Sequence, residues 1–444
     1  MKKTVTPLLA SIALCAALPL QAHAELDVVK LKATIETSVE SDYPKLDALY
    51  KEIHAHPEIA FQEVKTAAKL AAEMRALGFE VTEGVGKTGV VAIYRNGDGP
   101  TIMVRTELDA LPMEEKTGLP YASHDKTNWN GRETFVAHSC GHDIHMASWV
   151  GTAKTLLGLK DQWHGTLMFI GQPAEEIGAG AMAMLSDGLF TRFPKPDVAF
   201  GLHDGPGPYG FIFYRVGIGS SNSNGLAITF HGRGGHGAAP QLTIDPVVIA
   251  ARFVLDVQSV ISREKDPVEF GVVSIGAIHG GTAENIIPDD VRVFGTIRSF
   301  KPEVRARMHA GIERTANAAA AMSGAPAPDI AITEGAKAVM NDPAVVATAE
   351  TMLKAAFGDK FTTSAPATAS EDFSEFAAAG VPSMFFNIGV YDPERVASAR
   401  KSGTPLPGNH SPLFAPVPKP TIETGVTAMT LAVLSAFDQH ARGK

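Results

Sequence analysis

The chain has 444 residues, which is too long for one ordinary core and predicts about two domains. Its 45% hydrophobic, 20% charged and 7% aromatic residues are typical of a soluble globular protein that buries a large core. The formal charge is −9 and the charges are interspersed, which excludes the basic stripe of a nucleic-acid-binding protein.

The N-terminus has the pattern of a secretory signal peptide over residues 1–24. Two lysines follow Met1, an apolar run at residues 8–20 is too short to span a bilayer, and Ala-His-Ala at residues 22–24 resembles a cleavage site. We therefore expect export to a periplasm or the medium, a mature chain that begins at Glu25, and no membrane attachment after cleavage.

Cysteine usage indicates a single thiol in the mature chain. Cys15 lies in the signal peptide, so that only Cys140 remains and no internal disulfide can form. A free thiol in an oxidising compartment is open to oxidation, and either metal ligation or burial would protect it.

Helical spacing of apolar residues predicts helices at residues 42–54 and 62–77, and Gly78 ends the second helix. The segment Gly84-Val-Gly-Lys-Thr-Gly89 matches a dinucleotide fingerprint by letter. A strand and not a helix follows it, so we interpret it as a hairpin loop. Short β-rich runs predict three strands, at residues 79–82, 89–94 and 101–104.

A further helix is expected at residues 141–159, which places Cys140 and His142 at its N-terminus. Backbone N–H groups at that end of a helix favour a thiolate. The pair is therefore a candidate for one half of a metal site.

Two buried strands then lead to polar side chains. A strand at residues 165–171 leads to Glu175 and Glu176, and a strand at residues 197–202 leads to His203. In an open α/β sheet, ligands gather beyond the carboxyl ends of the strands, so we expect these side chains to lie close together.

From residue 222 the pattern changes to that of a ferredoxin-like βαββαβ sandwich, and an α/β pattern resumes near Asp342. We therefore expect a smaller domain at residues 222–333, inserted into a catalytic α/β domain formed by residues 25–221 and 334–444. Its predicted elements are strands at residues 225–231, 268–280, 284–298 and 327–333 and helices at residues 244–263 and 302–323.

Six side chains are candidates for a metal centre, because each lies in a loop or at the end of an element and not on a periodic core face. A thiolate and an imidazole two residues apart suit a borderline-soft ion such as Zn2+, whereas Mn2+ favours additional carboxylate. Two divalent ions about 3.5–4 Å apart can polarise a carbonyl and generate hydroxide from a bridging water. The candidates are Cys140, His142, Glu175, Glu176, His203 and His410.

The adjacent Glu175 and Glu176 have a specific use. In an extended segment, neighbouring side chains point in opposite directions, so that one carboxylate can bind a metal while the other takes a proton from water. A solvated surface pair is the alternative, but the apolar strand before the pair and Gly178 after it argue against that interpretation.

Nine short motifs occur in order along the mature chain: His54-Ala-His-Pro-Glu58, Arg105 to Pro112, His138 to Asp143, Gln172-Pro-Ala-Glu-Glu176, Gly201-Leu-His203, Gly232-Arg-Gly-Gly-His236, Gly281-Thr-Ala-Glu-Asn285-Ile-Ile-Pro, Ser370-Glu-Asp-Phe373 and His410-Ser-Pro412. Together they resemble the metal-dependent amidohydrolases. That family includes hippurate hydrolases, N-acyl-amino-acid amidohydrolases, bacterial aminoacylase-carboxypeptidases and plant auxin-conjugate hydrolases.

The resemblance implies a zinc-exopeptidase-like α/β catalytic domain with a mixed sheet flanked by helices, and an inserted lid at residues 222–333 that forms a homodimer. It implies Glu175 as general base and His236, in relatives often supplied across the dimer, as a group that holds the oxyanion. Asn285 would bind the substrate carboxylate, and Asp109 would orient a histidine ligand. Two divalent ions, Zn2+, Mn2+ or Co2+, would be held by Cys140, His142, Glu176, His203 and His410.

The chain departs from the family pattern at three of these motifs, one of which has Ser139 before Cys140-Gly-His142 where relatives usually have alanine. Thr106-Glu-Leu-Asp109 stands where relatives usually have Ala-Asp-Met-Asp, and His236-Gly-Ala-Ala-Pro-Gln241 stands where they usually have His-Ala-Ala-Met-Pro-His. All the ligands that the resemblance implies are present, so the difference near His236 leaves open the choice of substrate and not the chemistry.

We expect an exported hydrolase that cleaves the amide bond of N-acyl or N-aroyl amino acids or of short peptides. The residues leave open a cysteine hydrolase with Cys140 as nucleophile, a non-catalytic periplasmic metal- or peptide-binding protein, and a dimer module formed by the inserted domain. Arg298, at a strand end, could pair with a substrate carboxylate, and a structural ion pair is the alternative.

The remaining histidines fall into two groups. His138 and His145 lie close enough to the centre to support its ligands. The others are expected to be hydrogen-bonded in the interior or exposed at the surface: His54, His56, His124, His164, His231, His279, His309 and His440.

Overall fold

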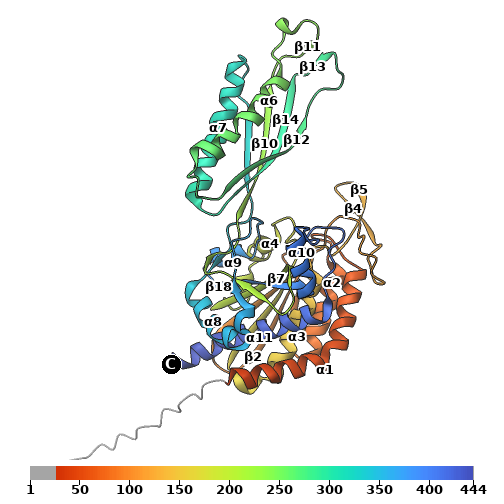
Figure 1. Ribbon diagram of the computed structural model, residues 1–444, viewed down its shortest axis with the longest axis vertical. Coiled ribbons are helices and arrows are strands. Elements are labelled where there is room, and N and C mark those ends of the chain that lie inside the picture. Colours follow the sequence, from red (N-terminus) through yellow and green to blue (C-terminus); the bar gives the residue numbers. More distant parts are fainter. Residues whose placement is uncertain (1–26, 444) are drawn as a thin grey trace, which may run out of the picture.

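The computed structural model describes residues 27–443 and has two parts, each with its own sheet and hydrophobic core (Figure 1). The larger part is a mixed eight-stranded sheet with helices on both faces, which confirms the predicted α/β class. The predicted signal peptide lies outside the described residues. Within residues 27–443, none of the helices combines the length and hydropathy needed to cross a bilayer.

One face of the large sheet carries the long helices, which bury the main core against it. These are α1 (Val28–Ala55), α2 (Val64–Ala76), α3 (His142–Gly158), α8 (Pro343–Phe357) and α11 (Pro418–Arg442). Shorter helices bury a second core on the other face: α4 (Gly180–Ser186), α5 (Leu189–Arg192) and α9 (Ser374–Ala378). The helix α10 is Pro393–Ser402, and 3-10 turns lie at Lys160–Gln162, Pro240–Leu242 and Gly358–Lys360.

The first helix is longer than predicted. It begins at Val28 because the Asp27 carboxylate caps its first turn by accepting from the Lys30 N–H, and it continues through Pro44. The predicted start at residue 42 was therefore wrong, since the proline near that position does not break the helix.

The strand order of the large sheet is β1-β2-β6-β3-β7-β18-β8-β17. Strands β6, β3, β7 and β18 are mutually parallel, so their carboxyl ends meet at one edge. The strands are β1 (Glu80–Val85), β2 (Gly89–Asn96), β3 (Thr101–Glu107), β6 (Gly165–Gln172), β7 (Val198–Pro208), β8 (Ile212–Tyr214), β17 (Phe361–Thr363) and β18 (Ser383–Tyr391). A separate hairpin joins β4 (Lys126–Trp129) to β5 (Arg132–Phe135).

The smaller part is an antiparallel sheet of order β12-β14-β10-β15 with two helices on one face (Figure 1). Its elements are β10 (Asn222–His231), α6 (Pro246–Asp256), β12 (Gly271–His279), β14 (Asp290–Ser299), α7 (Pro302–Met322) and β15 (Asp329–Glu334). The two segments that join it to the large part pair with each other through β9 (Gly217–Ile218) and β16 (Met340–Asn341).

Two predictions for this part were wrong. The predicted helix at residues 244–263 is α6 followed by a separate π-helical turn at Val260–Glu264. The predicted strand at residues 284–298 is interrupted at Pro288, which has no N–H to donate to a ladder. Its first half, β13 (Ile286–Ile287), pairs instead with β11 (Gly235–His236).

Candidate metal centre and active site

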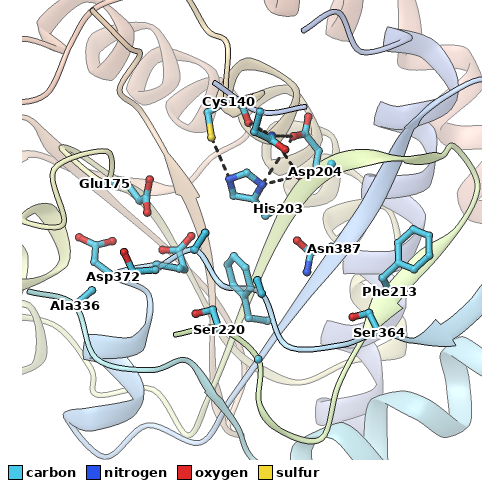
Figure 2. A pocket seen from close by; sticks show the side chains of 18 of the residues that line it. Cys140, Glu175, His203, Asp204, Phe213, Ser220, Ala336, Ser364, Asp372 and Asn387 are labelled. Atoms are coloured by element: carbon cyan, nitrogen blue, oxygen red, sulfur yellow. Dashed lines mark hydrogen bonds and ion pairs between the residues drawn. The ribbon is translucent and has the colours of Figure 1, made fainter. Parts of the chain in front are cut away.

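A cavity of about 780 Å3 opens beyond the carboxyl ends of the parallel strands, where the sequence predicted a site. Figure 2 shows Glu175 on one side of the cavity and Phe213, Asn387 and Ser364 on the opposite side. Five of the six metal-centre candidates line it: Cys140, Glu175, Glu176, His203 and His410. The sixth, His142, is fully buried behind the wall.

A tight turn places Cys140 and His142 at the start of α3. Gly141 has φ +84°, and a Cβ at this position would lie 2.1 Å from an oxygen of the Asp204 carboxylate. Only glycine fits both the left-handed conformation and this close approach. The turn therefore places the thiol at the cavity wall while His142 begins α3.

Two candidate histidines are held in a fixed tautomer by backbone carbonyls. Nδ1 of His142 lies 2.7 Å from the carbonyl oxygen of Asp109, and Nδ1 of His203 lies 2.7 Å from the carbonyl oxygen of Asp204. A carbonyl oxygen can only accept, so each Nδ1 carries the proton and each Nε2 is left with a free lone pair. Burial lowers the pKa of His142 to about 3, which keeps it neutral.

Both free Nε2 atoms point into one cluster. Nε2 of His203 lies 3.5 Å from Sγ of Cys140 (Figure 2). Nε2 of His142 lies 3.8 Å from Oε2 of Glu175 and 3.9 Å from Oε1 of Glu176. Candidates far apart in the sequence are thus brought together.

The Glu175–Glu176 segment is a turn and not an extended strand, so the predicted reason for the different roles of the two carboxylates was wrong. The N–H of Gly178 donates to the carbonyl of Glu175 at 2.7 Å and closes the turn. The Asp109 carboxylate accepts from the N–H groups of Glu175 and Glu176, each at 3.0 Å. Asp109 therefore contacts His142 chiefly through its carbonyl, while its carboxylate fixes the backbone of the glutamate pair.

The environment still gives the two glutamates different properties. Glu176 lies 3.2 Å from Nε2 of His410, and this contact helps to hold the pKa of Glu176 low although burial opposes it. Burial, together with the nearby carboxylates of Glu371, Glu176 and Asp372, raises the pKa of Glu175 well above its usual range. A carboxylate with raised proton affinity suits a general base.

His410 is delivered by a loop that is anchored to the cysteine turn. Its N–H donates to the carbonyl of Ser139 at 2.7 Å. The side-chain amide of Asn409 donates to the carbonyl of Cys140 and to the Asp204 carboxylate, each at 3.0 Å. These contacts join residues near the C-terminus to the start of α3.

The cluster fits a pair of divalent ions. Nε2 of His142 and Oε1 of Glu176 are buried and have no hydrogen-bond partner within residues 27–443. Ligand atoms of Cys140, Glu176 and His410 lie within 4.8 Å of one another, and those of His142, Glu175 and Glu176 do so as well. Sulfur, imidazole nitrogen and carboxylate oxygen form a mixed donor set that suits such ions.

The N-terminus of α3 was predicted to favour the thiolate form of Cys140, but the surroundings of the thiol favour the protonated form. Burial and the nearby carboxylates of Glu176, Glu175 and Asp204 raise the pKa of the thiol well above its usual range. A bound cation would oppose this effect, because it neutralises the carboxylates and favours the thiolate.

A buried ion network beneath the site has no assigned role in the sequence analysis. The Arg105 side chain is fully buried, and Nη2 lies 2.7 Å from Glu371 and 3.2 Å from Asp372. Nη1 of Arg105 also contacts the Glu107 carboxylate, and Nε donates to the side-chain oxygen of Gln172 at 2.9 Å. Arg105 directly follows the predicted apolar strand at residues 101–104. A charged residue that continues a buried strand indicates that buried groups of opposite charge must lie near it.

His145 supports the centre and does not belong to the ligand set. The N–H of Asp204 donates to Nε2 of His145 at 2.9 Å, so Nε2 has no free lone pair for a metal. Its Nδ1 lies 3.0 Å from the Glu107 carboxylate. His138 is also buried near the cluster, but neither of its ring nitrogens has a partner among the described residues.

Two residues with roles implied by the resemblance are not brought to the cavity. His236 is exposed in β11, and Asn285 is exposed next to β13, at the end of the smaller part that lies away from the large sheet (Figure 1). Neither of them lines the cavity. Their predicted roles therefore require a movement of the lid or a second copy of the chain.

Arg298 does line the cavity, from the base of the smaller part. Its Nη1 donates to the Ser370 hydroxyl at 2.8 Å, and no acidic group among residues 27–443 forms an ion pair with it. The alternative of a structural ion pair was therefore wrong, and its guanidinium is available to a substrate anion.

Comparison with known proteins agrees with this chemistry. A model of "Peptidase family M20/M25/M40" matches residues 103–401. The chain is 36% identical to a hippurate hydrolase of Campylobacter jejuni over 75% of this chain and 85% of that protein. It is 34% identical to thermostable carboxypeptidase 2 of Saccharolobus solfataricus over 86% of this chain and 93% of that protein.

Solved structures show the same fold. The Bacillus subtilis YXEP protein, described as a dinuclear metal-binding peptidase from the M20 family, superposes with a TM-score of 0.73 at 28% identity. The superposition covers 90% of this chain and 99% of that one. The family match, the shared fold and the cluster of ligand-type side chains lead to one conclusion: the chain belongs to peptidase family M20/M25/M40 and is a metal-dependent hydrolase of amide or peptide bonds.

Proposed function

We propose that this protein hydrolyses N-acyl or N-aroyl amino acids, or short peptides, into a carboxylate and a free amine. The observation that carries the proposal is the position of Glu175, a buried carboxylate at the cavity wall within 3.8 Å of a neutral histidine of the metal cluster. The cavity volume of about 780 Å3 lies in the range of sites for small molecules. The similarity to a hippurate hydrolase supports an acylated amino acid as substrate.

The residues of the chain have distinct tasks in this reaction. Glu175 takes a proton from the attacking water and passes it to the leaving nitrogen. Arg298 binds the carboxylate of the substrate at the mouth of the cavity. Two divalent ions, for which Zn2+, Mn2+ and Co2+ are the candidates, polarise the scissile carbonyl and activate water when bound. They would be held by Cys140, His142, Glu176, His203 and His410.

Chelation is expected to abolish hydrolysis reversibly. We expect a panel of N-acyl amino acids, benzoylglycine included, to be cleaved by the mature protein, to resist cleavage after dialysis against a chelator, and to be cleaved again after Mn2+, Zn2+ or Co2+ is restored. Release of the free amino acid is the measurement. Activity that persists without metal would contradict the proposal.

A thiol mechanism is the second candidate, because Nε2 of His203 lies 3.5 Å from Sγ of Cys140. The same measurement separates the two, since a cysteine hydrolase works without metal. The carboxylates around Cys140 favour the metal mechanism, because they oppose a thiolate that no cation compensates.

We also propose a homodimer in which the smaller part of one chain supplies His236 to the cavity of the other. Phe294 is 40% exposed and lies on the sheet face opposite the helices, where it contacts His279. Glu175→Gln and His236→Ala subunits, each inactive alone, are expected to recover roughly a quarter of the parental activity when mixed, because one site per mixed dimer keeps both groups. No recovery, or a fully active monomer by light scattering, would contradict this proposal.

Export is proposed from the N-terminal pattern alone. Expression of the full chain in a bacterium is expected to give a periplasmic protein whose N-terminus, read by sequencing, is Glu25. An uncleaved cytoplasmic protein would contradict the proposal.

A further inference from the structure

The turn that carries Glu175 and Glu176 begins with a strained residue. Ala174 is fully buried and has φ +51°, a left-handed conformation that is strained for an L-residue with a Cβ. Such a conformation persists only where the surroundings determine it strongly, and it is typical of functional sites. The φ of Ala174 also sets the direction in which the chain enters Glu175.

A buried carboxylate from a distant part of the chain holds this residue. Glu63, which precedes α2, is fully buried, and its Oε1 accepts from the Ala174 N–H at 2.8 Å. Its Oε2 accepts from the Thr88 hydroxyl at 2.6 Å. Among residues 27–443, no basic group forms an ion pair with Glu63.

The absence of a basic partner argues against a purely stabilising role for Glu63. A buried carboxylate without a counter-charge costs free energy, and burial raises its pKa. Glu63 does not line the cavity. Its carboxylate contacts the Thr88 hydroxyl, backbone groups of its own loop at Phe61 and Glu63, and the Ala174 N–H. The Ala174 contact is the one that joins Glu63 to the turn that carries Glu175 and Glu176.

The glycine-rich loop at residues 84–89 completes this support. A Cβ on Gly89 would lie 3.1 Å from Cδ of Pro173, and one on Gly86 would lie 2.6 Å from the backbone nitrogen of Met184. The loop therefore packs closely against the segment that contains the turn, and it presents Thr88 to Glu63. The segment at residues 84–89, which matches a dinucleotide fingerprint by letter, thus has a structural role in supporting the turn.

We propose that Glu63 is a positioning residue for the active site, which holds Ala174 in its left-handed conformation and thereby fixes where Glu175 and Glu176 stand. The inference rests on the proposed function, in which Glu175 is the general base and Glu176 is a metal ligand. Asp109 fixes the next two N–H groups, so that two carboxylates hold three consecutive amides of the turn.

The test compares substitutions of Glu63 that keep or remove the acceptor. Glu63→Gln can still accept from the Ala174 N–H while its amide donates to the Thr88 hydroxyl, and is expected to keep kcat within about threefold of the parent. Glu63→Met has no acceptor and is expected to lower kcat about 10–100-fold with little change in KM, and to weaken Zn2+ binding by a similar factor.

The decisive experiment relieves the backbone strain at residue 174 and measures whether kcat recovers. Glycine adopts the left-handed conformation freely, so Ala174→Gly in the Glu63→Met background is expected to recover kcat at least about fivefold. A stabilising role alone would give no such recovery. Failure of Ala174→Gly to restore kcat would overturn the proposal.

Glu58 offers a matched control. Its carboxylate also accepts from one backbone N–H and one threonine hydroxyl, both of Thr66, at 2.8 and 3.0 Å, but it does not reach the turn. Glu58→Met is expected to leave kcat and Zn2+ affinity unchanged. Equal effects of Glu58→Met and Glu63→Met on kcat would overturn the proposal.

Two further measurements keep the outcome clear. If Glu63→Met does not fold, Thr88→Val removes the hydroxyl that donates to the same carboxylate. This variant is expected to lower kcat about threefold or more without changing KM. An unchanged kcat would overturn the proposal. Zn2+ affinity, measured by competition with a chelator, needs no substrate. A parent that cleaves none of the panel would thus contradict the proposed function, while the Zn2+ affinities still decide the role of Glu63.

Discussion

Replacement of Glu175 by glutamine is expected to reduce kcat about 10²–10⁴-fold while the protein keeps its metal. Glutamine preserves the size of the side chain but cannot take the proton of the attacking water. The Asp109 contacts reach only the backbone of this residue, so the turn should stay in place. The measurement combines steady-state kinetics with metal analysis of the same preparation.

Glu114→Gln is a suitable control, because Glu114 is exposed and its ion pair in the described part of the chain is with exposed Lys116 at 3.3 Å. It is expected to behave as the parent in both measurements. Turnover within about tenfold of the parent in Glu175→Gln would remove Glu175 from the mechanism. Loss of metal together with activity would instead assign this residue to the ligand set.

Replacement of Arg105 by methionine is expected to cause the largest loss of stability, about 3–5 kcal/mol in the free energy of unfolding. The guanidinium contacts the carboxylates of Glu107, Glu371 and Asp372, and its own side chain is fully buried. Removal of the cation leaves these carboxylates without their counter-charge in a medium of low dielectric constant. The measurement is the midpoint of unfolding in urea, which is uncharged and allows the ionic strength to be held constant.

Arg95→Met on the adjacent part of the same sheet gives the comparison. Arg95 pairs with Glu80 at 2.9 Å, but both side chains are largely exposed to solvent. The loss of this pair is expected to change the free energy of unfolding by less than about 1 kcal/mol. Similar midpoints for the two variants would show that the buried carboxylates take up protons when Arg105 is absent.

The sequence predicted those features that depend on local pattern and residue type. The strands at β2, β3 and β6 and the helix α3 follow from the spacing of apolar residues, and the thiol, imidazole and carboxylate candidates follow from their position at strand and helix ends. The structure places these candidates around one cavity because parallel strands share one edge.

Features that depend on contacts between distant residues could not be predicted in the same way. The residue type of Ala174 does not predict its φ of +51°. The turn is held by the carboxylates of Glu63 and Asp109, which are distant in the sequence. Two partners of Arg105, Glu371 and Asp372, lie 266 and 267 residues away in the sequence, and local periodicity carries no information about them.

The strand order of the large sheet has a consequence for biosynthesis. β18 lies between β7 and β8, which are consecutive in the sequence, so one side of β7 has no neighbouring strand until residues 383–391 have been synthesised. The Asn409 contacts with Cys140 and Asp204 form later still. Chains that end before residue 383 lack the strand that joins β7 to β8, and chains that end before His410 lack one of the proposed metal ligands, so we expect both to be inactive.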